Sequence, residues 1–129
     1  MQPILICGSA RVSIEELKIL FGEHPELAAV RKELAHQQAH VLLGGLHASA
    51  RALALAHMKA PLFVIFDNAE AAQYIYADLR LMAKGEGQEA NVGFFPAAQR
   101  RRTIDEAATL QRTETLTALV SENVEIVVS

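Results

Sequence analysis

The sequence predicts an α/β domain built around a parallel sheet. From residue 40 onward, short aliphatic stretches typical of buried strands alternate with longer stretches of helical periodicity. The connections are far too long for hairpins, so we expect parallel strands joined by right-handed crossovers. A chain of 129 residues has the size of one domain. We therefore expect a single α/β domain over residues 13–129, preceded by an N-terminal arm over residues 1–12.

Composition narrows the class of protein. The formal net charge of −3 argues against a basic surface wide enough to hold DNA by phosphate neutralisation alone. The single cysteine excludes an internal disulfide and a cysteine-rich zinc site, and it fits a reducing compartment. No apolar stretch reaches the length of a membrane span, about 18 residues. We expect a cytoplasmic protein with no membrane contact.

Two helices are predicted ahead of the first strand. Ser13-Ile14-Glu15-Glu16 is a capping box, so a helix should begin there and run to about Phe21, where Gly22 stops it. Pro25 suits the first turn of a second helix. The apolar stripe of that helix comprises Leu27, Val30 and Leu34.

The middle of the chain predicts a strand, a glycine turn, a helix and a second strand. Residues 40–43 are β-favouring and break at Gly44 and Gly45, and the alanine- and leucine-rich run 48–58 predicts a helix buried on most sides. Pro61 opens a strand over residues 62–66. Its apolar residues do not alternate with polar ones, which predicts a strand covered on both faces by helices.

The next helix is amphipathic. Asp67 and Asn68 end the preceding strand and can cap this helix. Tyr74 and Tyr76 resemble stacking platforms for bases, but packing roles are the favoured interpretation. The stripe facing the sheet comprises Ala72, Ile75, Leu79 and Met82.

The C-terminal third predicts a third strand at residues 92–95, a last helix and a final strand at 124–128. A second capping box, Thr103-Ile104-Asp105-Glu106, should start the helix near residue 103 or 104. The chain stops directly after the final strand, which suggests a piece of a longer protein, truncated at that strand. The later apolar face of the helix comprises Leu116, Leu119 and Val120.

The glycine turn matches the frame of a phosphate-binding loop, G-x-x-x-x-G-K-[ST], but lacks most of its chemistry. From Gly45, the pattern places Ala50 at the second glycine, Arg51 at the lysine and Ala52 at the hydroxyl that would hold Mg²⁺. Ser49 is one residue too early to replace that hydroxyl. The forked guanidinium of arginine is not equivalent to lysine in a tightly closed loop. We expect no catalytic residues, cofactor or metal here, and a plain strand-to-helix turn is an equally good interpretation of the glycines.

Other candidate sites are weaker. His36 and His40 lack a third ligand at zinc-site spacing. Ser49 with His47 and Asp67 would offer a nucleophile and a base, but Ser49 lacks the G-x-S-x-G turn that exposes a nucleophile. The triplet Arg100, Arg101 and Arg102 could contact an anion, DNA or an acidic partner weakly, although a solvated loop is the favoured interpretation.

Several segments, in this order and spacing, resemble the N-terminal region of the bacterial transcription-repair coupling factor (Mfd) family. The resemblance covers about residues 14–129 and looks closest to family members from the Bacteroidetes. The segments are Gly44-Gly45-Leu46-His47-Ala48-Ser49-Ala50, Phe66-Asp67-Asn68-Ala69-Glu70-Ala71, Tyr76-Ala77-Asp78-Leu79, Phe94-Phe95-Pro96 and Arg112-Thr113-Glu114-Thr115-Leu116.

The resemblance implies a degenerate P-loop NTPase-like fold, similar to domain 1a of the repair protein UvrB, that neither binds nor hydrolyses ATP. In that family an adjoining subdomain recruits UvrA to stalled RNA polymerase. The ATP-driven translocase motor and the polymerase-binding domain lie far downstream. This chain would thus contact UvrA only indirectly, and RNA polymerase and DNA only through distant domains of the parent protein.

Two hypotheses follow for the function. The first is a non-catalytic scaffold and interaction domain of a DNA-repair coupling protein. The alternative is a small nucleotide- or phosphate-binding α/β enzyme that uses Gly45 to Arg51 as a variant phosphate loop.

Overall fold

The computed structural model describes residues 12–58, 61–84, 87, 91–98 and 105–129. Most of the expected N-terminal arm, the triplet at 100–102 and the first half of the second capping box therefore lie outside the described residues. The elements within them are helices α1 (Ile14–Gly22), α2 (Pro25–Leu34), α3 (Ala50–Ala56), α4 (Ala69–Lys84) and α5 (Glu106–Val120), and strands β1 (Leu62–Val64), β2 (Val92–Phe94) and β3 (Ile126–Val128).

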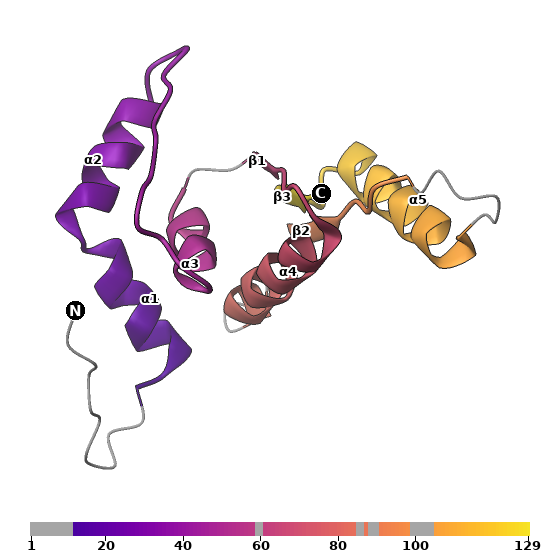
Figure 1. Cartoon of the computed structure of the whole chain (residues 1–129), viewed down its shortest axis with the longest axis horizontal. Helices are drawn as coiled ribbons and strands as arrows, with labels where there is room; N and C mark the ends of the chain where they lie inside the picture. Colours follow the sequence, from indigo (N-terminus) through magenta and orange to yellow (C-terminus); the bar gives the residue numbers. More distant parts are fainter. Residues whose placement is uncertain (1–11, 59–60, 85–86, 88–90, 99–104) are drawn as a thin grey trace.

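The described strands form a three-stranded parallel sheet in the order β1-β3-β2, so the α/β prediction is confirmed. The last strand of the chain lies at the centre, where Val127 pairs with Phe63 on one side and Gly93 on the other. In Figure 1, α3 and the α1–α2 pair lie to one side of the sheet and α5 to the other. Both connections cross over through a helix, as parallel pairing requires.

One face of the sheet carries the core. The stripe predicted on α4 is confirmed, because all four of its residues are buried against this face. The predicted buried helix is confirmed in α3, where Leu53 is among the buried residues. The core cluster comprises Ala52, Leu53, Ala72, Ile75, Leu79, Met82, Val92, Phe94 and Val128.

The helix starts that depend on local capping are confirmed. Ser13 Oγ accepts from the N–H of Glu16 at 3.1 Å, and Glu16 Oε2 accepts from the N–H of Ser13 at 2.8 Å. Pro25 is the first residue of α2. At α4, Asn68 Oδ1 accepts from the N–H of Ala71 at 2.8 Å. Each cap satisfies an N–H group that has no partner inside the helix.

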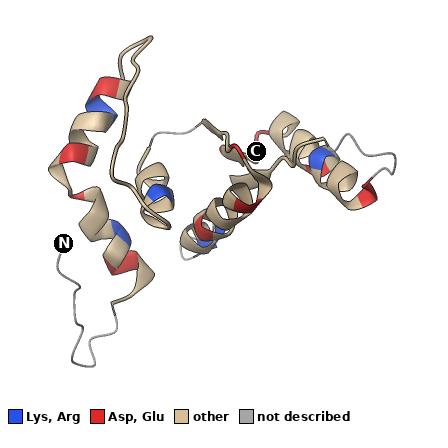
Figure 2. Ribbon diagram, in the orientation of Figure 1, with Lys and Arg blue, Asp and Glu red and all other residues tan. Residues whose placement is uncertain are grey.

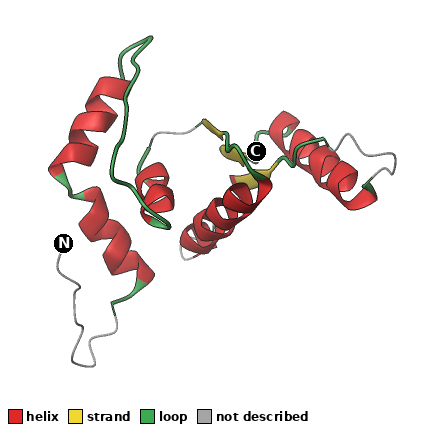
Figure 3. Cartoon of the chain, in the orientation of Figure 1, coloured by secondary structure: helices red, strands yellow, loops and turns green. Residues whose placement is uncertain are grey.

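The strand predicted at 40–43 is wrong, because this segment is a loop between α2 and α3 (Figure 3). Leu42 in this loop is 96% exposed. Strand propensity becomes a strand only where a partner strand accepts the backbone bonds, and β1 pairs here with β3 alone. Leu34, predicted to lie in the stripe of α2, is half exposed beside the loop.

The prediction that helices cover both faces of the strand at residues 62–66, which contains β1, is also wrong. Phe63 is 63% exposed and Ile65 is 71% exposed, whereas Leu62, Val64 and Phe66 are half-buried toward the core. α5 packs on β2 and leaves this side of β1 open. The side chains of residues 62–66 are thus alternately exposed and half-buried, although all five are apolar.

α5 differs from its prediction in its first residue and in the face that is buried. It begins at Glu106, and its N-cap is Asp105, whose Oδ1 accepts from the N–H of Ala108 at 3.1 Å. The predicted apolar face is wrong, because its three residues, Leu116, Leu119 and Val120, are all exposed. Thr115 is the buried residue instead, since a small side chain is required where this helix crosses Gly93.

Candidate functional site

The glycine turn before α3 is the site that the sequence singled out. Gly45 has a φ of +76° and Ala48 a φ of +47°, both in the left-handed region. Open space surrounds Gly44 and Gly45, since a Cβ at either position would have no neighbour within 4 Å. The backbone conformation, and not a close approach, therefore explains the glycine at position 45.

Two N–H groups of this turn, those of Ala50 and Arg51, are already bonded within the turn. Ala50 N–H donates to His47 O at 3.0 Å, and Arg51 N–H donates to Ala48 O at 3.2 Å. Ser49 is the N-cap of α3, and its side chain makes no capping bond. A phosphate cradle needs successive N–H groups directed at the ligand. The N–H groups at the second glycine position and at the lysine position are instead bonded to carbonyls.

The residues at the lysine and hydroxyl positions of the loop pattern also make contacts within the protein. Ala52, at the hydroxyl position, is fully buried in the core cluster. Arg51, at the lysine position, has an exposed side chain whose Nε donates to Leu46 O at 3.4 Å. The guanidinium is thus drawn across the turn that a phosphate would occupy.

A pocket of about 390 Å³ lies between this turn and α4, and it has mixed charge. Its polar side chains are Ser49 and Arg51 from the turn and Tyr74 and Asp78 from α4. One guanidinium and one carboxylate give the pocket no net charge. A polyphosphate needs several cations or a metal, so the charge distribution suits it poorly.

The tyrosines of α4 have different environments. Tyr76 packs its ring 5.2 Å from that of Phe94, centroid to centroid, and Arg80 Nη1 donates to its hydroxyl at 3.4 Å. The packing role is therefore confirmed for Tyr76. Tyr74 is 65% exposed beside the mixed-charge pocket, so the packing role predicted for it is wrong.

A second pocket, of about 380 Å³, lies at the carboxyl ends of the strands. Parallel α/β sheets usually bind ligands at this edge. Sequence reasoning missed the pocket, although the polar residues that follow the strands, Asp67 and Asn68, were a usable signal. Asn68 Nδ2 donates to Asp67 Oδ1 at 2.9 Å, and Asp105 lies across the pocket as the cap of α5. Two carboxylates here disfavour an anionic ligand.

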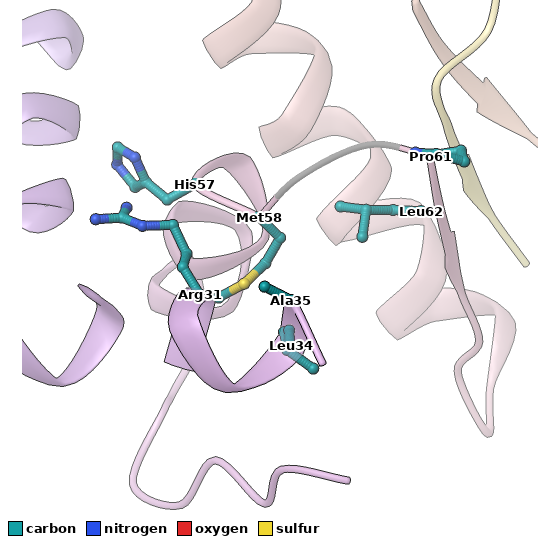
Figure 4. Close-up of a pocket in the computed structure, with 7 residues that line it drawn as sticks. All are labelled: Arg31, Leu34, Ala35, His57, Met58, Pro61 and Leu62. Carbon is teal, nitrogen blue, oxygen red and sulfur yellow. The ribbon is translucent and has the colours of Figure 1, made fainter. Parts of the chain in front are cut away.

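A third pocket, of about 550 Å³, lies between α2, the end of α3 and the start of β1 (Figure 4). Arg31 and His57 extend away from Pro61 and Leu62 in this view. Arg31 Nη2 donates to Gly22 O at 3.2 Å, and His57 Nε2 lies 2.7 Å from Lys18 O. Both side chains thus meet carbonyls in the last turns of α1, a structural role.

The remaining predicted candidates are not brought together. Ser49 and Asp67 line different pockets. Among the residues with described placement, no group of three or more His, Cys, Asp or Glu side chains could hold a metal ion. No helix of the described ranges is both long and apolar enough to cross a membrane.

Comparisons of this chain with family models, with curated proteins and with solved structures give no match. The fold class therefore rests on the structure, and a proposal about function has to rest on the sequence and on the chemistry of the turn and its pockets.

Proposed function

We propose that this chain is a non-catalytic scaffold and interaction domain of a transcription-repair coupling factor, with a degenerate P-loop NTPase-like fold similar to UvrB domain 1a. The parallel sheet flanked by helices is compatible with such a fold. The family is proposed on the order and spacing of the sequence segments that resemble it.

The observation that carries the non-catalytic part is the bonding of the glycine turn. The N–H groups of Ala50 and Arg51 are used by the carbonyls of His47 and Ala48. Binding a phosphate there would break both bonds, and Ala52 offers no hydroxyl for a metal. In the neighbouring pocket the carboxylate of Asp78 offsets the positive charge of Arg51, which leaves no net attraction for an anion.

Calorimetry with millimolar ATP and Mg²⁺ tests this part. We expect no heat of binding, and the same flat trace from Arg51→Ala. A micromolar dissociation constant for the natural sequence, lost in Arg51→Ala and kept in Arg51→Lys, would overturn the proposal. Such a result would establish the turn as a working phosphate loop.

The parent protein, on this proposal, couples the removal of stalled RNA polymerase to nucleotide excision repair by recruiting UvrA. It would be a cytoplasmic, ATP-dependent DNA translocase whose helicase-like motor lies outside this chain. UvrA would bind the adjoining subdomain, and RNA polymerase and DNA would bind distant domains. Reading the open frame beyond Ser129 tests this placement: a translocase motor downstream supports it, and a stop codon with no motor overturns it.

One observation favours the alternative, a small nucleotide- or phosphate-binding enzyme. The exposed Arg51 side chain borders a pocket of about 390 Å³, which is large enough for a small ligand. In that case Arg51→Ala should abolish phosphate binding while the circular dichroism spectrum stays unchanged.

Weak DNA contact through Arg100, Arg101 and Arg102 also stays a prediction. It requires retention on duplex DNA that falls steeply with salt.

A further inference from the structure

The mixed-charge pocket between the glycine turn and α4 has opposite charges on its two walls. The turn and the start of α3 contribute Ser49 and Arg51, and α4 contributes Tyr74 and Asp78. Figure 2 shows basic colour on α3 and acidic colour on α4, two helices that pack together. A guanidinium and a hydroxyl, both hydrogen-bond donors, therefore line one wall, and a carboxylate lines the other.

The two charges of this pocket are not paired with each other. Among the described residues, the half-buried Asp78 carboxylate has no hydrogen-bond or ion-pair partner, and the Arg51 side chain bonds to Leu46 O through Nε alone. Within that part of the chain, both terminal NH₂ groups of the guanidinium stay available, as does the hydroxyl of Ser49, which makes no capping bond. A half-buried carboxylate without a partner gains free energy when a cationic donor reaches it.

The pocket has the size and the surface of a small-molecule site. Its volume is about 390 Å³, within the range of about 300–1,000 Å³ that such sites occupy. Ala71 and Ile75 add apolar surface along the α4 wall, and the side chain of Tyr74 is 65% exposed beside them. Because residues three or four apart are neighbours on a helix, the ring of Tyr74 lies next to the carboxylate of Asp78. An apolar group can therefore stack on the ring while a charged group meets the carboxylate.

We propose that this pocket binds an α-amino acid in its zwitterionic form. The ligand carboxylate accepts from the Arg51 guanidinium and the Ser49 hydroxyl, and the ligand ammonium donates to the Asp78 carboxylate. The ligand side chain packs on the ring of Tyr74. A zwitterion suits this pocket better than a phosphate does, because it meets both unpaired charges at once and adds no net charge. This binding is additional to the scaffold role and does not depend on it.

NMR titration of the full chain with L-phenylalanine tests the proposal. We expect the amide signals of residues 48–51 and 74–78 to shift, with a dissociation constant of about 1 mM. 2-Phenylethylamine carries the ammonium alone, and 3-phenylpropionate carries the carboxylate alone. Each should bind about tenfold more weakly, or less, because one charge-assisted contact is lost. Glycine, which has no ring, should also bind more weakly than L-phenylalanine.

Two nearly isosteric variants remove one charge of the pocket at a time. Asp78→Asn and Arg51→Gln should each weaken L-phenylalanine binding by about tenfold. Asp78→Asn should not weaken 3-phenylpropionate, and Arg51→Gln should not weaken 2-phenylethylamine, because these ligands lack the group that the substitution deprives of its partner. The matched control is Glu70→Gln, which changes an exposed carboxylate of α4 outside the pocket and should leave binding unchanged. Unchanged circular dichroism spectra show that the variants are folded.

The result that supports the proposal is binding of L-phenylalanine that requires both charges of the ligand and both charges of the pocket. The absence of any shift up to about 20 mM ligand overturns it. Equal binding of the three phenyl compounds also overturns it, since apolar contact alone would then explain the binding.

Inorganic phosphate distinguishes a zwitterion site from an anion site. Phosphate that shifts residues 48–51, and binds more tightly to Asp78→Asn than to the natural sequence, shows that the pocket selects anions and overturns the proposal. Calorimetry with ATP decides the scaffold role separately, so the failure of one proposal is distinguishable from the failure of the other.

Discussion

Replacing Thr115 by valine tests how α5 holds the sheet. Thr115 is 5% exposed, and its hydroxyl donates to the carbonyl of Phe94 at 2.6 Å. Phe94 is equally buried, and its carbonyl faces away from β3. Valine has nearly the same shape but no hydroxyl, so the carbonyl loses its donor in a place that water does not reach.

Leaving a buried acceptor without a partner costs about 1–3 kcal/mol. We expect Thr115→Val to lower the free energy of unfolding by about 2 kcal/mol. With a urea m-value of about 2 kcal/mol/M, the midpoint of unfolding falls by about 1 M. Equilibrium urea unfolding followed by circular dichroism measures both quantities.

Two variants on the same helix separate the hydrogen bond from packing. Thr117 is exposed, and its hydroxyl donates to Thr113 O within the helix, so Thr117→Val should change stability by less than about 0.5 kcal/mol. Thr115→Ser keeps the hydroxyl but removes the methyl group that packs against Gly93, and it should cost about 1 kcal/mol. The reasoning fails if Thr115→Val is as stable as the natural sequence, or if Thr117→Val is equally harmful.

Three further substitutions test local features, each by urea unfolding. Gly22→Ala should destabilise by about 1–3 kcal/mol, because its Cβ would lie 2.5 Å from Cε1 of His57. Gly45→Ala should cost about 1 kcal/mol, since its φ is +76°. Gly44→Ala, in open space and without a positive φ, is the control for both. Asn68→Ala should cost about 1 kcal/mol through its lost cap, and Asn68→Asp should cost little.

These three predictions have distinct points of failure. A Gly44→Ala variant as unstable as the other two glycine variants would show that backbone freedom in general, and not the clash or the positive φ, sets the effect. An unchanged midpoint for Asn68→Ala would show that the first turn of α4 is held by packing alone.

The elements that the sequence predicted well are those whose cause is local. The capping box at Ser13, the proline at position 25 and the stripe of α4 act over three or four residues of the same helix. Such contacts form wherever the helix forms. The residue type at the hydroxyl position is equally local information, because alanine at position 52 has no side-chain oxygen for a metal, and the absence of a metal stays a prediction.

The elements that were predicted wrongly depend on partners distant in sequence. Residues 40–43 have the composition of a strand, but no strand accepts their backbone bonds in the described sheet. α5 is buried through Thr115 and not through Leu116, because Gly93 leaves room for only a small side chain at the crossing. Periodicity within a helix does not contain that information.

The sequence by itself determined the class of fold, the positions of most helices and the alanine at position 52, where a phosphate-binding loop has its magnesium-binding hydroxyl. Only the tertiary structure decided that β3 occupies the centre of the described sheet, that the N–H groups of Ala50 and Arg51 bond to carbonyls of the turn, and that side chains of α5 bond to carbonyls along the outer edge of β2. The physical reason is that strand order and burial are set by pairings between residues far apart in the chain, whereas capping and helical periodicity are set within a few residues.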